Sequence, residues 1–346
     1  ACAGVIPTVV ALRCRQILTW MNTPEDIFEN AYIYILIIFL GIPATFLYNI
    51  LSGIIRSMGN SKTPLVFLTI SSFLNIGLDL ICIINLKMGV AGAAVATVVS
   101  QLVSGLLCLF YMIKKFEILR IQKEEWKINP HHMKVLCSMG IPMGLQYSIT
   151  AIGSVILQTA VNGLGSVAVA AVTAASKVSM FLCCPFDAMG ATMSTYGGQN
   201  VGAKKLERLG PGLKACSVLG IGYSLIAFVI AYFFGQDLAA FFVDTAEGTM
   251  LADAGTFLLV NVSFFIPLAF VNIVRFYIQG MGFSTFAILA GVFEMVARTI
   301  AALVLVPHFG FIGVCFASPL AWVFADIFLF PAYVHVRKRL NRMMGV

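Results

Sequence analysis

The sequence predicts an all-α membrane protein that crosses the bilayer many times. Hydrophobic residues make up 60% of the chain and charged residues 11%, whereas soluble domains carry about 25% charged residues. The apolar residues gather in runs of about 20, the length that crosses a bilayer core as a helix. Backbone groups in lipid must bond internally, and the runs lack the alternation of barrel strands, so we expect helices.

Ten membrane spans can be drawn along the chain from its apolar runs. They cover roughly residues 1–20, 31–57, 63–86, 90–113, 135–160, 167–195, 212–235, 251–280, 284–306 and 312–335. Several spans contain a proline, where a kink is expected because the ring removes a backbone donor. These prolines are Pro43, Pro142, Pro185, Pro267 and Pro319.

Loop charges predict how the chain is oriented in the cell membrane. Basic loops, of which Ile113–Lys134 is the longest, alternate with the acidic loops Asn22–Asn30 and Gln236–Asp253. Basic loops stay in the cytoplasm, so the C-terminus, with its basic segment 337–342, is expected to be cytoplasmic. The net charge of +7 therefore indicates topology, and no nucleic-acid partner is expected.

Motifs of the first half recur in the second half at an offset of 221 to 224 residues. Both copies run the same way across the membrane, which predicts two parallel lobes. The pairs are Pro43 and Pro267, Asn49 and Asn272, Met58-Gly59 and Met281-Gly282, Ser61 and Ser284, and Gly89-x-x-Gly92 and Gly310-x-x-Gly313.

The repeat also predicts the extent of each lobe. Residues 1–125 form an N-lobe with four of its helices, and residues 126–346 form a C-lobe with six. The N-lobe lacks counterparts of the first two C-lobe helices, so about 90 residues are expected to precede this chain in a protein of about twelve helices. Without those two helices, we expect that the chain does not transport.

Three polar residues within the apolar runs 63–86 and 90–113 form a candidate cation site. An ionised acid such as Asp79 costs roughly 3 kcal/mol at the centre of a membrane helix, which marks it as functional. Asn75 shares its helix face, and Thr97 is expected at the depth of Asp79, about 13 Å below the turn. Carboxylate, amide and hydroxyl oxygens suit a hard cation. The alternative is interhelical hydrogen bonding, which explains the Asn and the Thr better than the Asp.

The C-lobe has its own charged residues within spans. Glu294 and Arg298 lie four residues apart, so they either form an internal ion pair or take part in lining a cavity or coupling protonation. Asp187 either faces a cavity or binds a polar neighbour, and Asp326 is open to the same two interpretations. Arg275 lies near the end of its span, where its long side chain can reach the interface.

Other function classes lack support in the sequence. The nine cysteines are scattered without metal-ligand spacing, and the four histidines lie in loops or at helix ends. Sequence motifs typical of intramembrane enzymes are absent. We therefore expect neither an enzyme nor a resident cofactor.

Five segments carry a resemblance to a known family. The chain resembles the multidrug and toxic compound extrusion (MATE) family over nearly its whole length, and Glu294 with Arg298 also looks like that family. The segments are Gly198–Lys205 (GQNVGAKK), Arg56–Pro64 (RSMGNSKTP), Gly89–Thr97 (GVAGAAVAT), Gly140–Gln146 (GIPMGLQ) and Gln279–Gly282 (QGMG).

The resemblance implies a monomeric antiporter that takes Na⁺ or H⁺ inward and exports small amphipathic, often cationic compounds by rocker-switch alternating access. In Na⁺-linked members an Asn-x-x-x-Asp pair, followed eighteen residues later by Thr, forms the N-lobe cation site. Asn75, Asp79 and Thr97 match that spacing. Gln146 and Gln279 become cavity candidates by the same analogy. The alternative is a flippase for lipid-linked sugar precursors, from a related group.

Overall fold

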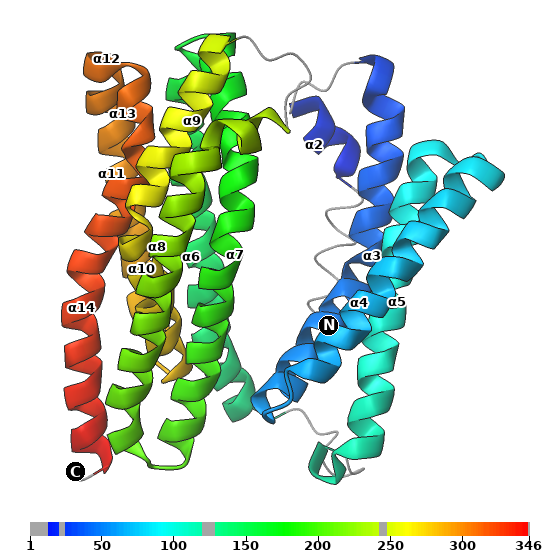
Figure 1. Ribbon diagram of the computed structural model, residues 1–346. Coiled ribbons are helices and arrows are strands. Elements are labelled where there is room, and N and C mark those ends of the chain that lie inside the picture. Colours follow the sequence, from blue (N-terminus) through cyan, green and yellow to red (C-terminus); the bar gives the residue numbers. More distant parts are fainter. Residues whose placement is uncertain (1–12, 21–24, 120–128, 242–247, 345–346) are drawn as a thin grey trace. The chain divides into compact units, whose positions relative to one another are not determined.

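The computed structural model describes residues 13–20, 25–119, 129–241 and 248–344, which are helical and contain no strand. The chain divides into two compact units, residues 1–127 and 128–346 (Figure 1). Among the described residues, eight helices are long and apolar enough to cross a membrane, or nine when one bent pair counts as a span. These nine confirm the expected spans from 31–57 onward. The first expected span, 1–20, lies largely outside the described residues.

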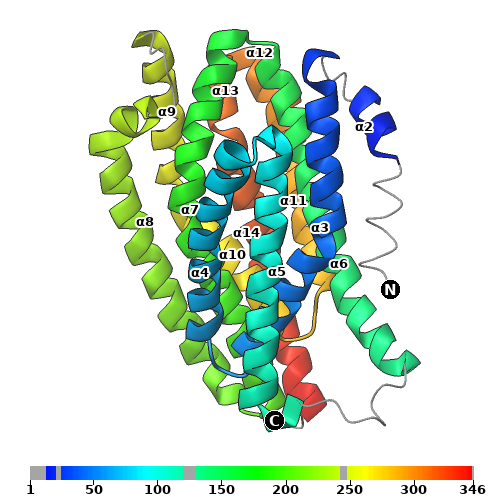
Figure 2. The same cartoon turned by 90° about the vertical axis from the view of Figure 1, so that its right-hand side faces the viewer.

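The first unit consists of a three-helix bundle and a short helix before it. Within it, α5 packs against both α3 and α4 (Figure 2), and the short helix is linked to α3 by an ion pair of 3.0 Å between Arg15 and Glu29. The helices are α2 (Cys14–Trp20), α3 (Glu25–Ser57), α4 (Lys62–Leu80), the π-helix Ile81–Asn85, α5 (Gly89–Lys115) and the 3₁₀ turn Glu117–Leu119.

The second unit contains the longer helices and a continuous core. Its largest fully buried side chains include Tyr277, Phe186 and Phe265. The helices are α6 (Pro130–Asn162), α7 (Ser166–Gly202), the 3₁₀ turn Leu206–Arg208, α8 (Leu209–Ala240), α9 (Gly248–Ser263), α10 (Phe265–Gly280), α11 (Thr285–Ile300), the π-helix Ala301–Leu305, α12 (Val306–Phe309), α13 (Phe311–Cys315) and α14 (Ala317–Met344).

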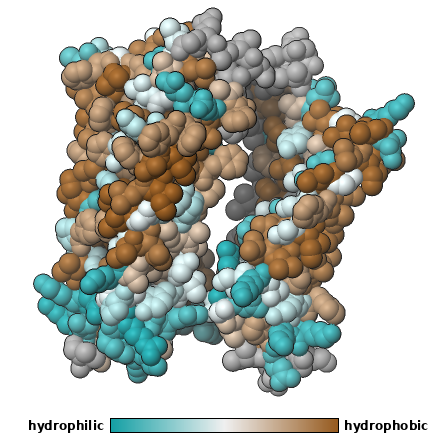
Figure 3. Space-filling model, in the orientation of Figure 1, coloured by the Kyte–Doolittle hydropathy of each residue, from teal (hydrophilic) through white to brown (hydrophobic). Residues whose placement is uncertain are grey.

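Apolar side chains cover much of the surface of each unit, as lipid contact requires. Figure 3 shows apolar residues over the middle of the helices and hydrophilic residues at the end of the second unit where the chain ends. Phe73 in the first unit and Met180 in the second are more than 70% exposed. In water such a surface would drive association, whereas acyl chains satisfy it.

One of the expected proline kinks is a sharp break. Helices α9 and α10 meet at Phe264 with a bend of 52°. Pro267 lies three residues after the break. It has no N–H to donate to the Ser263 carbonyl oxygen, and its ring clashes with that carbonyl group. By contrast, α3, α6 and α7 continue through Pro43, Pro142 and Pro185, and Pro319 lies in the first turn of α14, where a proline is tolerated.

The sequence repeat corresponds to a repeat of local structure. Gly59 and Gly282 have φ angles of +88° and +96°, and Gly89 and Gly310 have +56° and +57°. In each unit a π-helix of five residues lies shortly before the later of these glycines, Ile81–Asn85 before Gly89 and Ala301–Leu305 before Gly310. The recurring glycines therefore mark turns whose backbone is left-handed, a conformation that favours glycine.

Candidate cation site and buried charge cluster

The polar face of α4 packs against α5. Ser71 Oγ donates a hydrogen bond of 2.6 Å to the Ser100 carbonyl oxygen, and a Cβ atom on Gly92 would lie 2.9 Å from Cys82 Cβ. Asn75 and Asp79 continue the Ser71 face at intervals of one helical turn. They therefore lie between the two contacts, on the side of α4 that faces α5.

The contact between Ser71 and Ser100 also fixes the level of Thr97. Asn75 lies about one turn after Ser71, and Thr97 lies about one turn before Ser100 on the antiparallel helix. Thr97 therefore comes closest to the level of Asn75, with Asp79 about one turn nearer the hairpin turn.

The sequence expectation of equal depth for Asp79 and Thr97 assumed two regular α-helices. The π-helix Ile81–Asn85 has more residues per turn and advances less per residue. The distance along the axis from Asp79 to the hairpin turn is therefore shorter than in a regular α-helix. The three side chains still occupy neighbouring turns of one hairpin.

Several polar atoms of this hairpin are buried without a hydrogen-bond partner among the described residues. They are Asn75 Nδ2, Asp79 Oδ1 and Gln101 Oε1. Thr97 Oγ1 donates to the Ala93 carbonyl oxygen at 2.9 Å, so its lone pairs stay available. Buried polar groups are normally satisfied, and a hard cation would satisfy the orphaned oxygen of Asp79 and the hydroxyl oxygen of Thr97. The orphaned Asn75 Nδ2 is a donor, so Asn75 would bind a cation through its Oδ1. These residues fit the cation that the family resemblance implies.

Gln101 is a candidate that the sequence analysis did not include. It follows Thr97 by four residues, so both side chains lie on neighbouring turns of one face of α5. The sequence does carry a signal for it, because Gln101 is the one amide side chain in the apolar run 90–113 and follows Thr97 at helical spacing. Its unpartnered oxygen lies about level with Ser71, two turns farther from the hairpin turn than Asp79.

The second unit has a buried charge cluster around Glu294. Glu294 Oε1 accepts a hydrogen bond of 2.7 Å from Arg275 Nη1, and Glu294 Oε2 lies 3.7 Å from Arg298 Nη2. The predicted ion pair of Glu294 with Arg298 is thus present, but it is the longer of the two. The expectation for Arg275 was wrong, because its side chain lies in the interior, 9% exposed, instead of reaching the interface. A partner on another helix, Glu294, holds it there.

Neighbouring helices extend the cluster through polar contacts. Arg298 Nη1 donates to the Thr150 carbonyl oxygen on α6 at 3.2 Å. Gln279 Nε2 donates to Gln146 Oε1 at 2.8 Å, which joins α10 to α6. Both glutamines are 3% exposed, so they lie in the interior of this unit, and a role for them in a cavity stays a prediction.

Two aspartates complete the charged groups around Arg275. Asp326 on α14 is 8% exposed, its Oδ1 has no hydrogen-bond partner among the described residues, and it interacts electrostatically with Arg275 and Glu294. Asp187 on α7 lies at the surface of the unit and interacts electrostatically with Arg275. Its exposed position is compatible with a cavity-facing role, which stays a prediction.

The charge cluster occupies the positions that carry neutral polar residues in the first unit. The repeat offset of 223 residues relates each cluster residue of α10 and α11 to a residue of α3 or α4. The pairs are Ser52 and Arg275, Ser71 and Glu294, and Asn75 and Arg298. The same part of the fold therefore holds ions in one unit and a neutral polar face beside Asp79 in the other.

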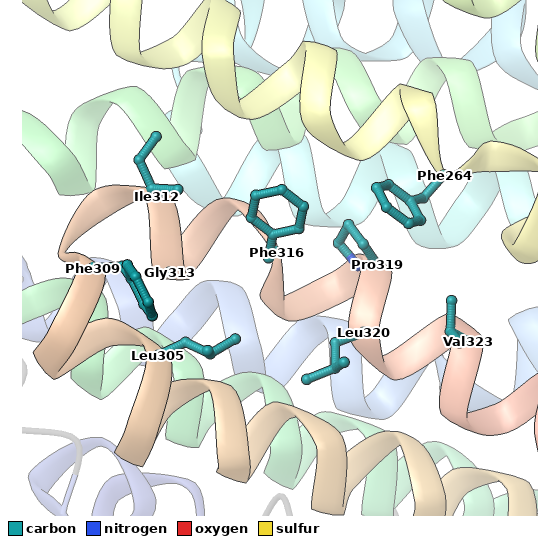
Figure 4. Close-up of a pocket in the computed structure, with 9 residues that line it drawn as sticks. All are labelled: Phe264, Leu305, Phe309, Ile312, Gly313, Phe316, Pro319, Leu320 and Val323. Atoms are coloured by element: carbon teal, nitrogen blue, oxygen red, sulfur yellow. The ribbon is translucent and has the colours of Figure 1, made fainter.

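The second unit also contains an apolar pocket of about 550 Å³ at the break between α9 and α10 (Figure 4). The residues that line it come from the α9–α10 break, from the end of the π-helix Ala301–Leu305, from α12 and α13, and from the first turns of α14. It offers no charged or hydrogen-bonding side chain, so it suits an acyl chain or the apolar part of a molecule. The lining residues are Phe264, Leu305, Phe309, Ile312, Gly313, Phe316, Pro319, Leu320 and Val323.

Comparison with known proteins decides the family. The sequence model of the MatE family matches residues 1–81 and 142–304. The chain belongs to the MatE family. This assignment confirms the resemblance that the glycine-rich segments indicated. The match covers α3 and α4 with Asn75 and Asp79, and α10 and α11 with Arg275, Glu294 and Arg298.

Curated relatives of this MatE-family chain include two proteins of Bacillus subtilis. The probable multidrug resistance protein YpnP is 31% identical over 262 residues, which cover 75% of this chain and 57% of YpnP. The probable multidrug resistance protein YoeA is 26% identical over 257 residues, covering 72% and 56%. The chain thus spans a little more than half the length of these relatives.

Solved structures show the same fold. A MATE crystal structure in the bent conformation superposes with a TM-score of 0.90 at 21% identity, covering 99% of this chain and 76% of that one. At this identity the match concerns the fold alone. The all-α, multi-span architecture of a MatE-family protein is therefore established for this chain.

Proposed function

We propose that this MatE-family protein exports small amphipathic, often cationic compounds across the cell membrane in exchange for a cation bound near Asp79. The observation that carries the proposal is the buried carboxylate oxygen of Asp79, which lacks a hydrogen-bond partner among the described residues. An unpaired charge at that depth is too costly to keep for packing alone. The names of the relatives, both probable multidrug resistance proteins, support export as the activity.

The donor set favours Na⁺ over H⁺ as the bound ion. A proton needs only the carboxylate of Asp79, whereas Na⁺ needs several oxygens at once. Asn75 and Thr97 carry such oxygens within about one helical turn of Asp79, whereas Gln101 lies about two turns away from Asp79. Asp79 supplies the negative charge, the amide and hydroxyl oxygens replace water around the ion, and the apolar packing of α4 and α5 excludes solvent.

Coupling follows when the cation and the exported compound stabilise different conformations. A ligand shifts an equilibrium between states only by its differential affinity for them. We infer that the ion favours the state in which α4 and α5 close around Asp79, and that the compound favours the opposite state. Alternation between states open to either side of the membrane would then exchange the two. From the basic loops we infer a cytoplasmic C-terminus.

Gradient-driven transport tests this function. The protein is expressed from its complete gene, and a fluorescent organic cation is added outside everted membrane vesicles under an imposed Na⁺ or H⁺ gradient. We expect accumulation in response to the Na⁺ gradient, absent from vesicles without the protein. Accumulation driven by the H⁺ gradient alone would identify the proton as the ion. No accumulation under either gradient would contradict the proposal of export.

A further inference from the structure

The buried charge cluster of the second unit contains two carboxylates in different situations. Glu294 accepts a hydrogen bond from Arg275 at 2.7 Å and has Arg298 at 3.7 Å. Asp326 has a carboxylate oxygen without a hydrogen-bond partner among the described residues, although it is 92% buried, since 8% is exposed. The two acids therefore differ in their partners, since Glu294 has a cation at each oxygen and Asp326 has an oxygen without a hydrogen bond.

Glu294 is enclosed by two positive charges. Two guanidinium groups on different helices lie against its two oxygens, Arg275 at 2.7 Å and Arg298 at 3.7 Å. Arginine keeps its charge in proteins, so both oxygens of Glu294 already have a cationic partner within the cluster.

The surroundings of Asp326 act on its protonation state in opposite directions. Burial without a hydrogen-bond partner and the negative charge of Glu294 favour its protonated form. The positive charge of Arg275 favours its ionised form, and Asp326 interacts electrostatically with both Arg275 and Glu294. Asp187 on α7, which also interacts with Arg275, competes for the same positive charge. A carboxyl group in this balance can change its protonation state when its surroundings move.

The other helices packed on α14 add no charged group at the level of Asp326. The helices α9 and α13 and the π-helix Ala301–Leu305 contact α14, and the last two contain no charged residue. The acid of α9, Asp253, interacts with Cys315, which lies about 16 Å along the helix axis from Asp326. Among the described residues, Arg275 and Glu294 are the charged groups that interact with Asp326, while Arg298 pairs with Glu294 and Asp187 interacts with Arg275.

We propose that Asp326 is a proton-binding site of the second unit, exchanging one proton with water while Glu294 keeps its ion pairs with Arg275 and Arg298. Binding of the proton raises the net charge of the cluster by one and ends the attraction between Asp326 and Arg275. The proton site rests on the cluster alone. Its use in transport rests on the proposed function.

Infrared difference spectroscopy tests proton binding directly. Spectra of the purified protein at a series of pH values are expected to show the carbonyl band of a buried carboxylic acid, which appears as the pH falls. In Asp326→Asn this band disappears, whereas in Asp326→Glu it persists at a shifted midpoint. Asp79→Asn, which removes the acid of the first unit, serves as the matched control and should retain the band.

A second measurement guards against misfolding of Asp326→Asn. Trp322 precedes Asp326 by four residues on α14, so it lies one turn away on the same face. In a Trp20→Phe/Trp126→Phe background its fluorescence should titrate with one step, and Asp326→Asn should abolish the step without changing the spectrum at high pH. An unchanged step, or a carboxylic acid band that is lost with Asp79→Asn instead, would overturn the proposal, as would the absence of any titrating band.

The role in transport has a separate outcome. Where the parent protein transports, Asp326→Asn is expected to export with a rate that no longer varies over the pH range of the Trp322 step. A parent protein that fails to transport would contradict the proposed function and leave the infrared result intact. A transporting Asp326→Asn variant with an unchanged pH profile would restrict the site to proton binding and overturn its role in coupling.

Discussion

Arg275 connects the charges of the second unit, because it contacts Glu294 on α11 and interacts with acids on α7 and α14. The sequence predicted the partner of Glu294 on its own helix, since a spacing of four residues is visible without a structure. It did not predict the shorter contact, which depends on how α10 packs against α11. Pairing between helices is set by tertiary packing, and a single sequence holds no periodic signal for it.

Removing Arg275 should strongly destabilise the second unit. Arg275→Met leaves Glu294 with only its longer ion pair, and loss of one partner of a buried pair costs about 3–5 kcal/mol. We expect a clearly lower midpoint of thermal unfolding in detergent, measured by fluorescence.

The matched control is the double variant Arg275→Met/Glu294→Met. Apolar residues of similar volume often replace a buried ion pair without loss of stability, so the midpoint should recover relative to Arg275→Met. A double variant less stable than Arg275→Met would show that the remaining charges, above all Arg298, depend on Glu294.

Thr97 provides a test of the oxygen donors in the first unit. Thr97→Val keeps the shape of the side chain and removes its oxygen, whereas Thr97→Ser keeps the oxygen. For bound Na⁺ we expect about tenfold weaker binding in Thr97→Val, which corresponds to about 1.4 kcal/mol, and near-normal binding in Thr97→Ser. Stabilisation of the purified protein by Na⁺, with K⁺ at equal ionic strength as reference, measures both. Equal Na⁺ affinity in the two variants would exclude Thr97 as a ligand.

At the scale of elements, the glycine-rich segments that indicated the family pack against each other. A Cβ atom on Gly198 would lie 3.1 Å from the Gly280 carbonyl oxygen, and one on Gly280 would overlap the backbone of Ser194. Small residues at such a crossing let α7 and α10 approach closely. The sequence showed the motifs, and the structure supplies the reason that each requires the other.

Gly280→Ala should therefore destabilise the second unit. The added methyl group meets the backbone of α7, which cannot rotate away, and overpacking of this kind costs about 1–3 kcal/mol. Gly222→Ala is the control, because Gly222 lies within α8 with nothing within 4 Å of the new atom, and alanine favours a helix by up to about 1 kcal/mol. Thermal unfolding should thus separate the two variants, and equal midpoints would contradict the close packing of α7 on α10.

The hairpins show where element prediction from sequence ends. The spans 63–86 and 90–113 agree with α4, its π-helix and α5 within a few residues, because apolar runs of bilayer length are a strong signal. The π-helices Ile81–Asn85 and Ala301–Leu305 carry no comparable signal. They shift the register of each hairpin, and for that reason the sequence misplaced Thr97 relative to Asp79.

At the scale of the whole molecule, two units share a fold and differ in charge. The repeat predicted the shared fold, since the recurring glycines mark the same left-handed turns in both units. The difference in charge was predicted in outline from Glu294 and Arg298, but its full extent required the positions of Arg275 and Asp326. We infer a division of roles, in which the first unit binds the driving cation and the second holds a fixed ion pair beside a proton site.

The central claim is that Asp79 binds the driving cation, and the most direct measurement is ion-driven transport by Asp79→Asn. The protein expressed from its complete gene is reconstituted in liposomes, and export of a fluorescent cation is followed under an imposed Na⁺ gradient. We predict that Asp79→Asn loses gradient-driven export by at least tenfold while its yield, thermal stability and binding of the fluorescent cation remain close to those of the parent. Undiminished gradient-driven export by Asp79→Asn would contradict the account.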